Sequence, residues 1–456
     1  MTSISRDIVA VAGLVGLGLT QMTTGQAQQP RQTDEISLTL FDSIGVQPSF
    51  AVPDCLTLSS DEPTAEAART IGQVLWDDLE FEGEFRMISR DIYRTIPVAR
   101  SLIDLPFPRW RELGADGVVS CTVEATGNGQ LEVSVRLYSV RSLESAYGVG
   151  FTVPTGGARR LAHQVSDEIH RDQRGLAGVA RTRIAFVSDR DSESVLGLVE
   201  NRAAKEIYIA DYDGAGVRRV TVTRILNSTP AWSPDGRSIA YMSYPNGFPD
   251  VIVSYLYEGR MARPANGTVE DHNFTPAFSP DGRQIAFWSN RHGNPDIYIM
   301  NVDGTDVRQL TNNPAIDESP TWSPNGQQIA FISDRTGAPQ VFVIGADGTG
   351  EERLTYESYA SRPTWSPPPF NEIAFAARTG PGFDIKVLDL ATRDVRQLTF
   401  GLGSNESPSY SPNGRHVAFT STRGSGLKQI YTIRRDGNGL SRVTSTGNNE
   451  MANWSR

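Results

Sequence analysis

The chain lacks the short motifs that mark the common catalytic sites. Its 456 residues contain no Gly-x-Ser-x-Gly elbow, no His-Glu-x-x-His motif, no Cys-x-x-Cys pair and no phosphate-binding loop. Histidine is scarce, and the histidines do not recur at matching positions of the internal repeat described below, as converging metal ligands would. We therefore predict no catalytic residue, no metal site and no cofactor, and we expect surface or loop positions for His163, His170, His272, His292 and His416.

Clusters of basic residues are also missing. The 43 lysines and arginines are outnumbered by 53 aspartates and glutamates, which gives a net charge of -10. Binding to a nucleic-acid backbone needs clustered basic charge. This composition excludes a nucleic-acid partner and favours a protein or a small ligand.

Long apolar runs are absent. The apolar run near the amino terminus, Ile8 to Leu19, is too short to span a bilayer. It follows a short polar segment and precedes small residues at Gly25 and Ala27, which is typical of a secretory signal peptide. We predict a signal peptide over residues 1–27 and export of the chain from Gln28; an uncleaved membrane anchor is the alternative that the short run disfavours.

Only two cysteines occur, Cys55 and Cys121. In an oxidising compartment they can form a disulfide that closes a long loop, which is worth up to about 4 kcal/mol. Two buried free thiols are the alternative, and the spacing alone does not decide between them.

What the chain has in abundance is a repeat. The segment Trp232-Ser233-Pro234-Asp235-Gly236 returns in variant form every 43 to 46 residues. Such a period indicates an array of one supersecondary unit. The aromatic residue that opens each copy is Trp232, Phe278, Trp322, Trp365, Tyr410 or Trp454.

One unit predicts four antiparallel strands. Segments 276–279, 285–288, 296–300 and 307–311 have strand composition and are separated by Pro, Asp and Gly turn residues. Four such strands make a propeller blade. Residues 183–187 have the pattern of the second strand of a blade, but no first strand precedes them. Residues 453–455 have the pattern of a first strand, but no second strand follows them. Because each fragment supplies the strand that the other lacks, the sequence predicts six blades closed by the carboxyl-terminal strand.

A different pattern precedes the repeats. Helical periodicity covers 64–80 and 158–169, and strand patterns cover 36–40, 85–88, 115–126 and 131–138. These elements predict a small α/β domain over residues 28–174, ahead of a propeller over 181–456. The fold class is mainly β.

The loops that feed the first strand of each blade carry acidic and amide groups. They gather at one mouth of the central channel, where they predict an acidic rim. Solvated loops explain the rim, and a cation bound at the mouth is the alternative. The four loops are 271–273, 317–319, 405–407 and 448–450.

Particular segments give the chain a family resemblance. They are Leu113-Gly114-Ala115-Asp116, Ser166-Asp167-Glu168-Ile169, the entry 181–186 into the propeller and the repeat 276–282. With the order of the domains, they resemble the TolB family of periplasmic propeller proteins of the Tol-Pal envelope system. The resemblance implies a non-enzymatic, monomeric adaptor in the periplasm that binds the lipoprotein Pal and the protein TolA. Such an adaptor is held at the outer membrane through Pal and supports outer-membrane integrity and invagination during cell division.

The resemblance also implies two binding regions. The channel mouth would contact Pal through a rim made of His272, Asn273, Thr275 and Glu318, to which Phe274 adds an apolar anchor. Segment 28–44 would contact TolA, and its alternation suits addition to a sheet edge. The residues of this TolA-binding segment are Glu35, Ile36, Leu38 and Leu40.

An exported propeller enzyme or sugar-binding protein is the competing hypothesis. A lyase of acidic sugars, for instance, needs a channel lined with basic residues and a metal. The predicted acidic rim disfavours it.

Overall fold

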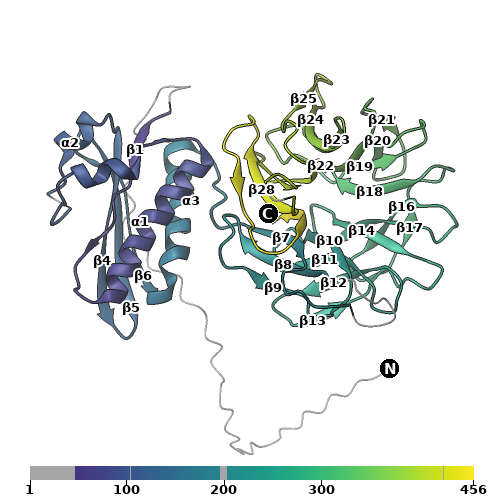
Figure 1. The fold of residues 1–456 in the computed structure, drawn as a ribbon, viewed down its shortest axis with the longest axis horizontal. Helices are drawn as coiled ribbons and strands as arrows, with labels where there is room; N and C mark the ends of the chain where they lie inside the picture. The colour runs from purple at the N-terminus through teal and green to yellow at the C-terminus, as the bar shows by residue number, and fades with distance from the viewer. Residues whose placement is uncertain (1–46, 103, 196–202, 425, 456) are drawn as a thin grey trace, which may run out of the picture.

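The computed structural model describes residues 47–102, 104–195, 203–424 and 426–455. An α/β domain and a β-propeller lie side by side, with helices α1 and α3 between the sheet of the first domain and the propeller (Figure 1). The predicted signal peptide and the predicted strand at 36–40 lie outside the described residues.

The amino-terminal domain is one sheet covered by two long helices. The strand order is β3-β1-β4-β5-β6, with β2 beside β4; β1 runs parallel to β3 and β4, and β4, β5 and β6 are antiparallel. Its elements are β1 (Ser49–Ala51), β2 (Leu56–Thr57), α1 (Glu62–Glu82), β3 (Arg86–Met87), η1 (Arg90–Thr95), α2 (Phe107–Glu112), β4 (Gly117–Gly127), β5 (Gln130–Ser139), β6 (Ser145–Pro154), η2 (Thr155–Gly157) and α3 (Ala158–Arg174).

Local signals account for the ends of α1. The Asp61 carboxylate accepts the Thr64 N–H at 3.0 Å and caps the first turn, in which proline is tolerated. Gly83 ends the helix at φ 71°, a conformation that glycine adopts without steric cost. The predicted helix at 158–169 is too short, because α3 continues to Arg174 and ends at the left-handed Gly175.

Strand β6 was not predicted, and neither were β1 and α2. Gly148, Gly150 and Pro154 weaken the strand pattern of β6, since glycine and proline are unfavourable inside strands. Pairing with β5 from Gln130 to Tyr138 overrides that local preference.

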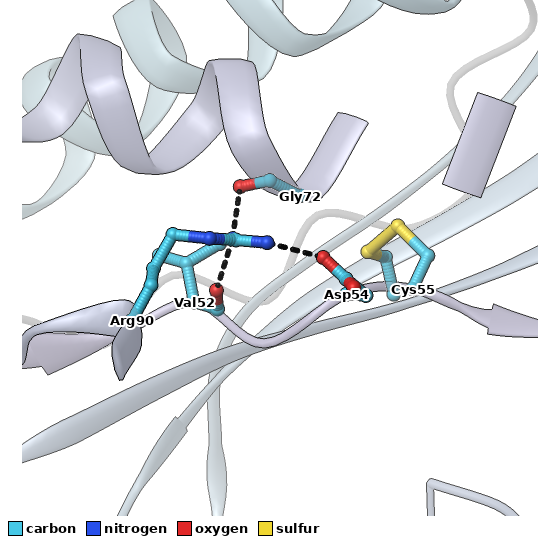
Figure 2. Close-up of a disulfide and its surroundings, with 6 residues drawn as sticks. Val52, Asp54, Cys55, Gly72 and Arg90 are labelled. Atoms are coloured by element: carbon cyan, nitrogen blue, oxygen red, sulfur yellow. Dashed lines mark hydrogen bonds and ion pairs between the residues drawn. A yellow bond between two sulfur atoms is a disulfide. The ribbon is translucent and has the colours of Figure 1, made fainter. Parts of the chain in front are cut away.

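A disulfide between Cys55 and Cys121 ties the start of the domain to β4 (Figure 2). Beside it, the Arg90 guanidinium donates to the Val52 and Gly72 carbonyl oxygens, both at 3.1 Å, and pairs with Asp54. Helix α1 approaches this segment closely at Gly72, where a Cβ would meet the Asp54 backbone at 3.0 Å. The bridge and Arg90 therefore hold the irregular segment 52–55 against helix and sheet.

The propeller has six four-stranded blades. Blade 1 is β30 (Asn449–Trp454), β7 (Arg183–Ser188), β8 (Glu206–Asp211) and β9 (Arg218–Arg219); blade 2 is β10 (Asn227–Trp232), β11 (Ser238–Ser243), β12 (Asp250–Tyr255) and β13 (Arg260–Ala262); blade 3 is β14 (Asn273–Phe278), β15 (Gln284–Ser289), β16 (Asp296–Asn301) and β17 (Arg308–Gln309). Blade 4 is β18 (Asp317–Trp322), β19 (Gln328–Ser333), β20 (Gln340–Gly345) and β21 (Glu352–Arg353); blade 5 is β22 (Ala360–Trp365), β23 (Glu372–Arg378), β24 (Phe383–Asp389) and β25 (Val395–Gln397); blade 6 is β26 (Asn405–Tyr410), β27 (His416–Ser421), β28 (Gln429–Arg434) and β29 (Ser441–Arg442).

The predicted closure is confirmed. Strand β30 is the innermost strand of blade 1 and pairs antiparallel with β7, from Asn449 opposite Ser188 to Trp454 opposite Ile184. The carboxyl terminus lies next to the strand that opens the propeller (Figure 1). The two ends of the array are thus joined in one sheet.

Buried polar groups fill the contact between the two domains. Asp78 on α1 accepts from the Tyr212 hydroxyl at 2.6 Å and lies 2.8 Å from Nδ1 of His163. His416 of blade 6 stacks on Phe81, with ring centroids 4.3 Å apart. The expectation of surface histidines is therefore wrong for His163, His170 and His416, which are all buried, because the two domains pack over them.

Candidate protein-binding site at the channel mouth

The innermost strands of all six blades begin at one end of the axial channel. There the inner strands of blades 2 to 6 line a cavity of about 320 Å³ that is built mainly from the second and third residues of these strands. We call this cavity, with the loops around it, the channel mouth. The cavity is lined by Ser228, Thr229, Met242, Phe274, Thr275, Trp288, Glu318, Ser319, Tyr359, Ser361, Arg362, Phe383 and Glu406.

A backbone irregularity recurs in every inner strand. The third residue has a positive φ, between 43° and 59°, and pairing with the second strand shifts at that point. Such bulges redirect side chains and are enriched beside functional sites. They bring the third residue of each inner strand to the channel: Thr229, Thr275, Ser319, Arg362, Ser407 and Met451.

The first residue of most inner strands has a structural role instead. In blade 3, Asn273 is fully buried, donates to Asp250 at 2.8 Å and accepts from Arg291 at 2.9 Å. Arg291 in turn stacks over Phe287 and Tyr298 of the same blade. The same arrangement recurs at Arg190 with Asn449, Arg335 with Asp317 and Arg423 with Asn405.

These contacts correct the predicted role of the first-strand loops. Their amide and acidic groups were expected to form a rim, yet four of them bind an arginine inside their own blade: Asn273, Asp317, Asn405 and Asn449. Asn273, which was predicted as a Pal contact, therefore has no exposed side chain to offer.

The other predicted rim residues lie at or beside the cavity. Phe274, Thr275 and Glu318 line it, and Phe274 stacks on Trp288 with ring centroids 4.0 Å apart. His272 lies next to Phe274, with ring centroids 6.3 Å apart, and its Nε2 donates to the Val269 carbonyl oxygen at 3.0 Å. The Thr275 hydroxyl has no hydrogen-bond partner among the described residues.

The channel mouth is not simply acidic. Arg362 lies in the electrostatic field of Glu318, Glu406 and Glu450, which favour its charged form against the burial that lowers its pKa. Glu450 is also paired with Lys205 and, at 2.6 Å, with Lys428. Three carboxylates thus face three cations, so the mouth is less acidic than predicted, because residues from other loops and strands supply positive charge.

Burial changes the chemistry of Glu318. Desolvation raises the pKa of its carboxyl above the ordinary value, and the positive charge of Arg362 opposes this shift. Within the described residues, no three His, Cys, Asp or Glu side chains are grouped to hold a metal ion. Positive charge at the mouth comes from the protein's own Arg362, Lys205 and Lys428.

Sequence reasoning missed Arg362 and Trp288 at this site. Aligning the repeats would have revealed Arg362, because the residue before the inner-strand proline is Thr or Ser in four blades and arginine in this one. Nothing comparable in the sequence marks Trp288, since a tryptophan in a predicted strand is expected to belong to the hydrophobic core.

The fold defines the class of protein: a six-bladed β-propeller preceded by a small α/β domain. A model of the TolB amino-terminal domain matches residues 43–145, and a model of the TolB β-propeller domain matches residues 173–456. The chain belongs to the TolB family.

Individual relatives agree with this assignment. The Tol-Pal system protein TolB of Desulfosudis oleivorans is 34% identical over 58% of this chain and 57% of its own length. That of Roseobacter denitrificans is 38% identical over 59% of this chain and 58% of its own length, so the chain spans little more than half the length of these curated relatives. The crystal structure of TolB from Acinetobacter baumannii superposes with a TM-score of 0.73 at 25% identity, over 94% of this chain and all of that one.

Proposed function

We propose that this protein is a non-enzymatic periplasmic adaptor of the Tol-Pal system, which binds Pal at the channel mouth and TolA through its amino-terminal segment. In that role it supports outer-membrane integrity and invagination during cell division, acts as a monomer and is held at the outer membrane through Pal. The observation that carries the proposal is the match of both domains, in order, to the two TolB family models. Export by a signal peptide over residues 1–27 belongs to the same proposal. Among the helices that the structure describes, none has the length and apolar character needed to cross a bilayer.

The channel mouth suits recognition of a protein. The stacked pair Phe274 and Trp288 offers an aromatic anchor, and the ring of charged groups around it offers polar contacts. Interfaces concentrate their binding energy in such anchors. A lyase of acidic sugars is less well supported, because Arg362 is the one basic residue lining the described cavity, which Glu318 and Glu406 also line.

We expect the substitution His272→Glu to weaken Pal binding by about 1–3 kcal/mol, because it adds a carboxylate beside Asp271 and Phe274 at the rim. Calorimetric titration with Pal, together with the melting temperature of the variant, measures this effect. Gln327→Glu is the matched control, since Gln327 is exposed in the turn between β18 and β19, at the other end of the channel. If His272→Glu binds Pal with wild-type affinity, or if Gln327→Glu loses as much affinity as His272→Glu does, the rim is not the Pal-binding site.

We expect deletion of residues 28–35 to abolish capture of TolA while Pal binding is retained. This segment and the predicted strand after it form the TolA-binding segment, which lies outside the described residues. A pull-down with immobilised TolA tests it, with His272→Glu as the reciprocal control that should still bind TolA. Undiminished capture by the deletion variant would exclude the segment as the TolA site.

A further inference from the structure

A cavity of about 350 Å³ lies in the amino-terminal domain, on the face of the sheet that is turned away from the propeller. Successive side chains of a strand point to opposite faces of its sheet. In β4, Cys121 belongs to the core under α1 and α3, whereas Val118 packs with Trp110 on the opposite face, which Ser120 shares. Because α1 and α3 lie between the sheet and the propeller, this cavity is remote from the channel mouth (Figure 1). We call it the sheet pocket.

The walls of the sheet pocket are mainly apolar. They include Leu56, Ile96, Val98, Leu105, Pro106 and Trp110. Val98 is 88% exposed, so part of this apolar surface is uncovered. Tyr93 contributes only its ring, since its hydroxyl donates to the Ile88 carbonyl oxygen at 3.0 Å and accepts the Val52 N–H at 2.9 Å. Sites for small molecules have such a lining, with a few polar groups that fix the orientation of the ligand.

One wall of the pocket is held in place by contacts within the domain. Asp54 and Leu56 line the pocket on either side of Cys55, which is bridged to Cys121 (Figure 2). Arg90 pairs with Asp54 and fixes the same segment. A ligand that binds against a rigid wall does not have to order it, so less binding energy is lost.

Two polar groups in the lining have no hydrogen-bond partner among the described residues. Ser120 is 2% exposed, and its hydroxyl makes no hydrogen bond there. The indole N–H of Trp110, which is also 2% exposed, makes none either. Buried polar groups are as a rule hydrogen-bonded. Unpaired donors beside an apolar cavity therefore point to a ligand that carries an acceptor.

The charged residues in the lining leave one arginine unpaired. They are Asp54, Arg90 and Arg94, and Asp54 pairs with Arg90. Arg94 is exposed and forms no ion pair with a described carboxylate, including that of Asp91 one turn earlier. The acceptor that best complements this lining is therefore an anion.

We propose that the sheet pocket binds a small aliphatic carboxylate. The carboxylate would accept a hydrogen bond from the Ser120 hydroxyl and pair with Arg94, whose planar group suits carboxylate recognition. The chain would cover the apolar walls, including the exposed Val98. The proposal is independent of the function assigned to the channel mouth, because the two sites lie in different domains.

Titration calorimetry of the full chain with monomeric decanoate tests the proposal. We expect decanoate to bind, and we expect decyltrimethylammonium, which has the same chain length and a cationic head group, to bind at least tenfold more weakly. Arg94→Gln should weaken decanoate binding by about tenfold, the effect of losing one paired charge. Arg100→Gln is the matched control, since Arg100 is an exposed arginine a few residues further on, outside the lining.

A second variant fills the pocket. Ser120→Leu replaces the hydroxyl with an apolar side chain that occupies part of the cavity, so it should abolish decanoate binding without lowering the melting temperature. Thr122→Leu is its control, because Thr122 is half-buried on the same face of β4 but does not line the pocket. No binding of decanoate by the wild type, equal binding of decyltrimethylammonium, or wild-type affinity in Ser120→Leu would each overturn the proposal. Binding of phosphatidylglycerol vesicles without binding of decanoate would replace it with a membrane contact.

Discussion

Removal of residues 451–456 is expected to lower the free energy of unfolding by more than about 4 kcal/mol, the upper part of the range for deleting a large buried side chain. Trp454 is buried in the seam between the two ends of the array, and its indole N–H donates to the Thr182 hydroxyl at 2.7 Å. Asn453 accepts the Trp232 N–H at 2.8 Å, and Ser455 exchanges hydrogen bonds with the backbone of Arg183. The truncation removes all of these contacts together with part of the ladder to β7.

Chemical denaturation monitored by circular dichroism measures this loss. A pair of single substitutions separates the seam from ordinary core packing: Trp454→Ala should cost about 3–5 kcal/mol, and Trp365→Ala less. Trp365 occupies the same position of its repeat but is partly exposed and lies away from the seam. An unchanged melting temperature of the truncated protein would contradict closure by the last strand.

The stability of the protein is expected to peak near pH 6.5, because of three titratable groups buried between the domains. Burial lowers the pKa of His170 to about 4 and that of His416 to about 3, and it raises the pKa of Glu82 to about 8. The charges facing His416 are those of Arg415, Arg434 and His170, and all of them favour its neutral form.

The sign of the effect follows from the protons bound in each state. Below pH 6.5, His170 and His416 become protonated in the unfolded chain but stay neutral in the folded chain. The free energy of unfolding therefore falls as the pH is lowered. Above pH 6.5 the folded chain still holds the Glu82 proton that the unfolded chain has lost, so stability falls as the pH rises towards 8. Each net proton changes the free energy of unfolding by about 1.4 kcal/mol per pH unit.

Denaturation curves between pH 4.5 and 8 measure this profile. Glu82→Gln should remove the decline above pH 6.5, and His416→Gln should flatten the decline below it. His272→Gln, at the channel mouth, is the control and should leave both limbs unchanged. A profile that Glu82→Gln and His416→Gln leave as in the wild type would show that the domain interface does not set the optimum.

Local and periodic features were readable from the sequence alone. The repeat of Trp232-Ser233-Pro234-Asp235-Gly236 predicted six blades, and the half-blades at 183–187 and 453–455 predicted the closure that β30 and β7 form. Helix α1 was predicted over residues 64–80 because its apolar residues recur at helical spacing. Each of these features depends on residues close in sequence or on a period that repeats, so no knowledge of tertiary contacts is needed.

Tertiary structure alone decided which polar groups are buried and which charges meet. Asn273 was predicted to lie on the rim, but it is buried and hydrogen-bonded to Arg291 and Asp250. His416 was predicted to lie at the surface or in a loop, but it stacks on Phe81 of the other domain. Likewise, the negative charge of Glu318 is offset by Arg362 in the next blade. Burial and net charge at a site depend on residues far apart in the chain, and a one-dimensional pattern does not record which of them the packing brings together.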